Sequence, residues 1–156
     1  MTEGNLRPIL LVEDDSSDAN LLCRAFEKAH VLNRVIHLPS GDEALGYLAG
    51  VKEYADRTLY PLPALILLDL KLPGLTGMQL LQWKRAHENV RRIPVVVLTG
   101  DKDPQTVAAA YDLGANSYLV KRAKSSEILT MVKAIDQYWV KLNEDPLLVT
   151  GADAGG

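Results

Sequence analysis

Short apolar runs alternate with amphipathic stretches along the whole chain. The apolar runs occupy residues 9–12, 35–38, 65–68, 95–98 and 117–120. Several of them are apolar at every position, which is typical of parallel strands buried on both faces. Between the runs, apolar residues recur at helical spacing; one such face holds Ile128, Val132, Ile135, Trp139 and Leu142. The pattern therefore predicts strands that alternate with helices.

Capping residues support the predicted helices. Ser40 and Thr76 each have a glutamate or glutamine three residues later, which is the spacing of a capping box. Asp103 is followed by proline, a favourable residue at the first helical position, and Gly114 suits the C-terminal end of the same helix.

Strands alternating with helices predict a parallel sheet covered on both faces, with right-handed crossovers. Five such units favour an α/β, flavodoxin-like (βα)5 fold, in which a doubly wound five-stranded sheet has the order 2-1-3-4-5. The 156 residues are enough for one domain of this kind. We predict a domain over residues 7–142, with a long connection at 51–63, and a C-terminal tail over residues 143–156.

Composition narrows the choice of partners. The chain is 47% hydrophobic and 24% charged, with a net charge of -3, as in an ordinary soluble protein with no general attraction to nucleic acid. No apolar run approaches the length of a membrane span, and nothing after about residue 145 suggests a DNA-binding module. A single cysteine suits a reducing compartment. We expect a cytoplasmic protein that binds neither nucleic acid nor membrane.

Acidic residues follow the two strands between which the winding of the predicted sheet reverses. Glu13 and Asp14 follow the first strand, and Asp69 follows the third. Ligands of open α/β sheets bind at this reversal, and converging carboxylates favour a hard cation such as Mg²⁺. Taken alone, the acidic run 13–15 would more often cap a helix. Asp15 also leaves an Asp14–Asp15 pair open, although Glu13 and Asp14 directly follow the strand.

Two further polar residues follow the fourth and fifth strands. The hydroxyl of Thr99 can donate to a phosphoryl oxygen, and the ammonium of Lys121 can pair with one. In isolation, the first would more often be a loop residue and the second a solvated charge. Together with a nucleophilic carboxylate and a metal, they are the groups that phosphoryl transfer needs. No glycine-rich nucleotide loop is present, so a nucleotide is not the expected donor.

The chain resembles the receiver domains of response regulators in two-component signalling. The segments that carry the resemblance each follow or end a predicted strand, and they are residues 11–15, 68–77, 97–100 and 118–121. The resemblance implies that Asp69 is phosphorylated by a partner histidine kinase. It also implies that Asp14 binds Mg²⁺ directly, that Glu13 assists through water, and that the backbone carbonyl of Lys71 is a further ligand.

The resemblance also implies a conformational switch made by Thr99 and Tyr118, with Lys121 contacting the phosphoryl group. Arg122 departs from the family pattern, because proline usually follows this lysine, often through a cis bond; the path of the loop is left open. The connection at 51–63 and the segment 135–140 look most like the small regulators paired with bacterial phytochromes.

The expected function is therefore a phosphorylated signalling switch rather than an enzyme. A Mg²⁺-dependent phosphatase of the haloacid dehalogenase type would need an acid two residues after the nucleophile, where this chain has Lys71. A receiver-like scaffold that is never phosphorylated would not need Asp69, Thr99 and Lys121 together. Expected partners are the histidine kinase and an unidentified downstream protein.

A homodimer is also predicted. If the final helix covers the sheet with the face named above, Tyr138 and Met131 point outward and leave apolar surface exposed. The tail adds Leu147, Leu148 and Val149. Such surfaces favour two-fold association. The alternative is that the tail folds back over these residues within one molecule.

Overall fold

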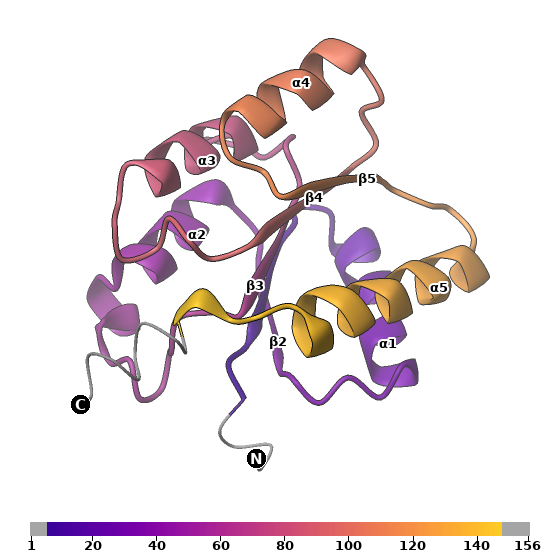
Figure 1. The fold of residues 1–156 in the computed structure, drawn as a ribbon, viewed down its shortest axis with the longest axis horizontal. Helices are drawn as coiled ribbons and strands as arrows, with labels where there is room; N and C mark the ends of the chain where they lie inside the picture. The colour runs from indigo at the N-terminus through magenta and orange to yellow at the C-terminus, as the bar shows by residue number, and fades with distance from the viewer. Residues whose placement is uncertain (1–5, 148–156) are drawn as a thin grey trace.

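A computed structural model of the chain describes residues 6–147 and confirms the predicted α/β fold (Figure 1). The strands are β1 (Ile9–Val12), β2 (Val35–Leu38), β3 (Leu65–Leu68), β4 (Val95–Thr99) and β5 (Ser117–Val120). The helices are α1 (Ser16–Lys28), α2 (Gly41–Ala49), α3 (Gly77–Arg85), α4 (Pro104–Asp112) and α5 (Ser125–Ile135). A short 3-10 helix η2 (Lys52–Ala55) follows α2, and a π-helix η3 (Asp136–Leu142) extends α5.

The strands form one parallel sheet in the predicted order β2-β1-β3-β4-β5. Every residue of β1, β3 and β4 is buried, which explains why β1 and β3 are apolar at each position and β4 is apolar up to its last residue, Thr99. The direction in which the chain winds along the sheet reverses between β1 and β3. Val12 of β1 is paired with Leu68 of β3 in the register. The two strands therefore end side by side.

Helices cover the sheet on both faces, α2, α3 and α4 on one and α1 and α5 on the other (Figure 1). Alternate residues of each strand point to opposite faces. In β1, Leu10 and Val12 join the core under α2, α3 and α4, whereas Ile9 and Leu11 join the core under α1 and α5. The described residues thus form two apolar cores, one on each side of the sheet.

The predicted helix caps are present. Ser40, Thr76 and Asp103 each accept a hydrogen bond from a backbone N–H in the first turn of α2, α3 and α4, respectively. Gly114 follows α4 with a φ of 105°, a conformation that glycine adopts without steric cost.

The long connection before β3 is fastened to the end of α2. Tyr47 of α2 is fully buried, and its ring contacts those of Tyr54 and Tyr60. Arg57 donates hydrogen bonds to the backbone carbonyls of Tyr47 and Leu48. These carbonyls lie in the last turn of α2, where backbone acceptors lack a full set of partners within the helix, so Arg57 anchors the connection to this helix end.

The predicted apolar face of the last helix is correct for Ile128, Val132 and Ile135, which are buried, but wrong for Leu142, which is 64% exposed. The reason is the π-helix η3, whose wider turn rotates the apolar stripe relative to α5. Trp139 still packs partly against the core under α1 and α5.

The part of the tail within the described residues lies against the domain. Leu147 packs against the core under α2, α3 and α4, and the carboxylate of Asp145 forms an ion pair with Arg7. Leu148 and Val149, which entered the dimer prediction, lie outside the described residues. Within residues 6–147, no helix is both long enough and apolar enough to cross a membrane.

Candidate functional site

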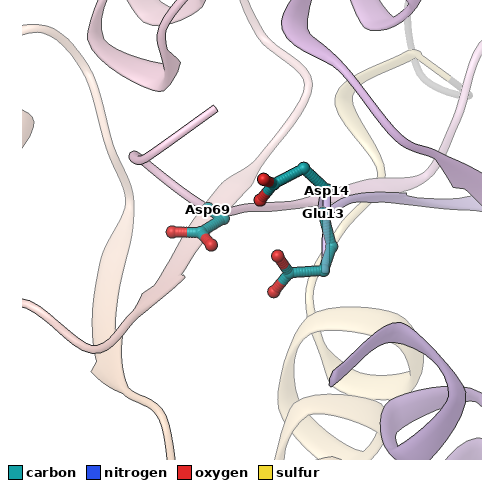
Figure 2. Close-up of side chains that lie close together, drawn as sticks. All are labelled: Glu13, Asp14 and Asp69. Atoms are coloured by element: carbon teal, nitrogen blue, oxygen red, sulfur yellow. The ribbon is translucent and has the colours of Figure 1, made fainter. Parts of the chain in front are cut away.

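Three carboxylates meet at the ends of β1 and β3. Glu13 and Asp14 directly follow β1, and Asp69 directly follows β3. Since the two strands are neighbours in register, their ends bring one oxygen of each carboxylate within 4.8 Å of the others. Figure 2 shows the three side chains gathered around one shared space. The group combines the acids that the sequence singled out.

Burial and charge affect two of these acids in opposite ways. Glu13 is 1% exposed and Asp69 is 6% exposed, whereas Asp14 is exposed. Burial raises the pKa of Glu13 to about 7, even though Lys121 opposes the shift. Burial would also raise the pKa of Asp69, but the hydrogen bond and charge of Lys121, together with the backbone N–H of Lys71 and the hydroxyl of Thr99, outweigh burial, so this pKa lies below its usual value.

Lys121 follows β5 and connects the acids of three elements. Its Nζ lies 2.9 Å from Asp69 Oδ2, 2.5 Å from Glu13 Oε1 and 2.9 Å from Asp18 Oδ2. Burial would lower the pKa of this lysine, but hydrogen bonds to the three acids outweigh burial and raise it. The ammonium is therefore charged beside an ionised Asp69.

Asp18 was not singled out from the sequence. It lies in the first turn of α1, where an acid is ordinary because it complements the helix dipole. Only the folded structure, in which the first turn of α1 lies beside the residue that follows β5, shows that its carboxylate reaches a lysine more than a hundred residues away in the chain. No local pattern in the sequence indicates this contact.

Asp15 takes a different role from Glu13 and Asp14. Its side chain accepts a hydrogen bond of 2.9 Å from the backbone N–H of Asp18 and caps α1. The acidic run therefore divides between the shared carboxylate group and a helix cap. The geometry favours Glu13 with Asp14, rather than Asp14 with Asp15, as the acids that face Asp69.

The acid group fits a hard divalent cation. Three carboxylates with oxygens within 4.8 Å supply the ligand type that Mg²⁺ prefers, and one exposed member leaves room for water. Lys71 lies beside the group, because its backbone N–H donates to Asp69 Oδ1 at 3.3 Å. That the Lys71 carbonyl is also a ligand stays a prediction.

Thr99 and Tyr118 lie on neighbouring strands near Asp69. Thr99 ends β4 and is 1% exposed; its Oγ1 makes no hydrogen bond of ordinary length and angle among the described residues, but it lies close enough to Asp69 to help lower the pKa of that acid. The hydroxyl of Tyr118 in β5 donates to the backbone carbonyl of Asp101 at 2.7 Å, which ties β5 to the loop after β4. No peptide bond in residues 6–147 is cis, so the Lys121–Arg122 bond is trans.

A doubly wound sheet with an aspartate group at its winding reversal is the architecture of receiver domains. The sequence matches the response regulator receiver domain over residues 9–133. The chain therefore belongs to the response regulator receiver family of two-component signalling, whose members act as signalling switches and bind a divalent metal. The domain limits of 7–142 stay a prediction.

Individual relatives extend over most of the chain. The probable methanogenesis regulatory protein FilR2 of Methanothrix harundinacea is 38% identical over 88% of this chain and 86% of its own length. Response regulator Rcp1 of Synechocystis is 35% identical over 85% of this chain and 88% of its own.

Solved structures agree with this assignment. The phosphorylated cyanobacterial phytochrome response regulator RcpA is 35% identical, with a TM-score of 0.84 over 90% of this chain and 99% of its own. Rcp1 in its Mn²⁺-bound form is 34% identical, with a TM-score of 0.81 and the same coverage of both chains. The resemblance to regulators associated with phytochromes is thus confirmed.

Proposed function

We propose that this protein is a response regulator that accepts a phosphoryl group on Asp69 from a histidine kinase, depends on Mg²⁺, and signals by a conformational switch. The observation that carries the proposal is the position of Asp69. Its carboxylate is grouped with Glu13 and Asp14 and held 2.9 Å from the Nζ of Lys121.

The chemistry begins with an ionised Asp69. Lys121 is one of the neighbours that hold the pKa of this carboxyl below its usual value. A carboxylate oxygen attacks the phosphorus of the kinase phosphohistidine; an O–P bond forms, the N–P bond breaks, and the imidazole nitrogen takes the electron pair. Bound Mg²⁺ would neutralise charge on the phosphoryl oxygens, held by the carboxylates of Glu13, Asp14 and Asp69 and the backbone carbonyl of Lys71.

Lys121 then pairs with a phosphoryl oxygen. In the unphosphorylated protein its ammonium is shared among Glu13, Asp18 and Asp69. A phosphoryl group on Asp69 adds oxygens at the same position and offers the ammonium a stronger partner than a single carboxylate. The lysine therefore orients the group while its backbone, which donates to the Thr99 carbonyl at 2.9 Å, stays attached to β4.

The switch uses the buried hydroxyl of Thr99, which lies beside Asp69. This hydroxyl makes no well-formed hydrogen bond among the described residues, so it gains one when a phosphoryl oxygen comes within reach, and Thr99 moves toward Asp69. The loop after Thr99 carries Asp101, whose carbonyl accepts the hydrogen bond of Tyr118. Movement of the loop changes that bond and alters the face formed by α4, β5 and α5.

The kinase partner is proposed to be of the phytochrome type. The similarity to Rcp1 and to the phytochrome response regulator RcpA supports this choice. The downstream partner remains to be identified, and the cytoplasm is the expected place of action.

A homodimer is part of the proposal. A groove of about 990 Å³ lies along β5 and α5, and Met131, Ile135, Tyr138 and Trp139 contribute to its lining. Tyr138 is 56% exposed, and exposed aromatic residues at such a groove favour an interface. Sedimentation of the wild type and of Tyr138→Ser tests it: a dimer weakened by the substitution supports the proposal, and a monomeric wild type at micromolar concentration rejects it.

Acetyl phosphate with Mg²⁺ tests the phosphoacceptor function. A persistent phosphoryl adduct with slow loss identifies a switch. Continuous turnover with many equivalents of released phosphate identifies a phosphatase, and the absence of both identifies a scaffold. Circular dichroism before and after the reaction shows that the protein remains folded.

A further inference from the structure

A second polar site lies at the opposite edge of the sheet from Asp69. Strands in this fold end at the Asp69 edge, and α3 and α4 run back from it to finish at the other edge. There the ends of α3 and α4 and the loop before β4 enclose a cavity of about 240 Å³. Its lining includes the cationic residues Lys84, Arg85, Arg91 and Arg92 over the apolar side chains of Leu81 and Leu113.

These four cations form a basic cluster in a chain whose net charge is -3. Residues 84–92 hold the four cations of the cavity and a single acid, Glu88. Among the described residues, none of the four cations forms an ion pair with a carboxylate. The lining therefore gathers four cationic side chains that no carboxylate of the described residues pairs with directly.

Lys84 sets this cavity apart from an ordinary basic surface. Its side chain is only 5% exposed, and burial lowers its pKa to about 8. Its Nζ donates to the backbone carbonyl of Arg91 at 2.8 Å, its one hydrogen bond among the described residues. An ammonium has three donors, so two remain for a ligand.

Arg85 is held in place at the same cavity. Its guanidinium donates to the carbonyl of Asp112 at 2.8 Å, in the last turn of α4. The carbonyls at this helix end would repel an anion, and Arg85 covers one of them with positive charge. The remaining N–H groups of the guanidinium stay available for an oxyanion.

We propose that this cavity binds a small phosphate-type oxyanion. The volume decides the size of the ligand, because about 240 Å³ is below the roughly 300–1,000 Å³ of sites that enclose drug-sized molecules. Inorganic phosphate, pyrophosphate or the terminal phosphate of a larger molecule fits this limit. Lys84 would donate from the floor, with Arg85, Arg91 and Arg92 contacting the anion from the rim.

Titration of the protein with inorganic phosphate, followed by amide chemical shifts, tests the proposal. Mg²⁺ is removed with a chelator, and a parallel titration with chloride at equal ionic strength removes the general effect of salt. Saturable shifts at Lys84, Arg91, Arg92 and Gly114 are expected at millimolar phosphate. A second arm with pyrophosphate shows whether the cavity prefers a free ion or a phosphate carried by another group.

Replacing the two exposed arginines of the cavity, Arg91 and Arg92, tests whether the cavity binds phosphate. Arg91→Gln with Arg92→Gln should weaken phosphate binding roughly tenfold or more, since two charge-assisted contacts are lost. Arg24→Gln with Lys28→Gln, on α1, removes the same charge elsewhere and should leave binding unchanged. Acetyl phosphate labelling of Asp69 should be the same in both double variants, which separates this site from the proposed phosphoacceptor.

Three results would overturn the proposal. One is the absence of saturable shifts beyond those produced by chloride. Another is unchanged phosphate binding in the Arg91 and Arg92 double variant. The third is a set of shifts confined to residues around Asp69 and Lys121, which would place the anion at the other edge of the sheet.

Discussion

Lys121 Nζ lies 2.9 Å from Asp69 Oδ2, so the strand at one edge of the sheet delivers a cation to the carboxylate at the sheet centre. Burial alone would raise the pKa of Asp69, and its polar neighbours, Lys121 first among them, reverse the direction. Asp69, the proposed acceptor, is buried, and its ionised form is therefore stabilised by a residue from another element.

Replacing Lys121 by methionine removes this charge while keeping much of the apolar stem. We expect Lys121→Met to accept phosphoryl groups from acetyl phosphate roughly tenfold to a hundredfold more slowly, which corresponds to the loss of one charged hydrogen bond. Intact-mass spectrometry over time measures the rate. Lys124→Met, an exposed cation of the same loop, is the matched control and should react like wild type. Equal rates for Lys121→Met and wild type would contradict the proposed role.

Asp14 is the exposed member of the acid group, so its replacement should not disturb the core. We expect Asp14→Ala to lose most Mg²⁺ binding and most phosphoryl acceptance, with an unchanged circular dichroism spectrum. Asp15→Asn is the control, because asparagine keeps the helix cap and removes one charge from the same acidic run. Wild-type labelling that proceeds equally well in a chelator would reject the metal requirement.

Tyr118 ties β5 to the loop after β4 through its hydroxyl. Tyr118→Phe should lower the free energy of unfolding by about 1 kcal/mol, the net value of one such hydrogen bond. The amide shifts of Asp101 and its neighbours should change even without phosphorylation. Tyr111→Phe removes a hydroxyl from an exposed tyrosine, so it should change neither the free energy of unfolding nor the amide shifts of Asp101. Urea unfolding and amide shifts of the two variants decide the matter; identical behaviour would remove Tyr118 from the switch.

Because Lys84 is buried, we expect the stability of the protein to depend on pH in a specific way. Its pKa in the folded protein is about 8, below the ordinary 10.5, so folding favours the neutral amine. The favourable contribution is complete above pH 10.5 and is lost as the pH falls to about 8. Over this range, the stability of wild type relative to Lys84→Met should rise with pH by on the order of 3 kcal/mol. Urea unfolding of both proteins in phosphate-free buffer measures it, and a difference that is flat across the range would show that the lysine is not desolvated.

The sequence was sufficient to predict the sheet because the buried strands leave a direct signal. β1 and β3 are apolar at every position, and the acids that follow them mark the ends of both strands. The strand order then brings Glu13, Asp14 and Asp69 together without any knowledge of side-chain contacts. This part of the site depends on topology alone.

Other features depend on packing and could not be predicted. The contact between Asp18 and Lys121 needs α1 and β5 in their final positions. The apolar spacing of α5 continues into the π-helix without a break in the sequence, so the helical pattern placed Leu142 on the buried face, whereas the structure exposes it. Lys84 looks like one of several helical cations in the sequence, and only the enclosure by α3, α4 and their loops shows that it is buried.

Asp69→Asn gives the most direct test of Asp69 as the phosphoacceptor. The wild type and this variant are incubated with acetyl phosphate and Mg²⁺, and the mass of the intact protein and of its peptides is measured. Asparagine removes one charge from a crowded acid group, so the variant should fold. We predict one phosphoryl group on the wild type, located on the peptide that contains Asp69, and none on the variant. Equal labelling of Asp69→Asn, or a phosphoryl group on a different peptide of the wild type, would contradict it.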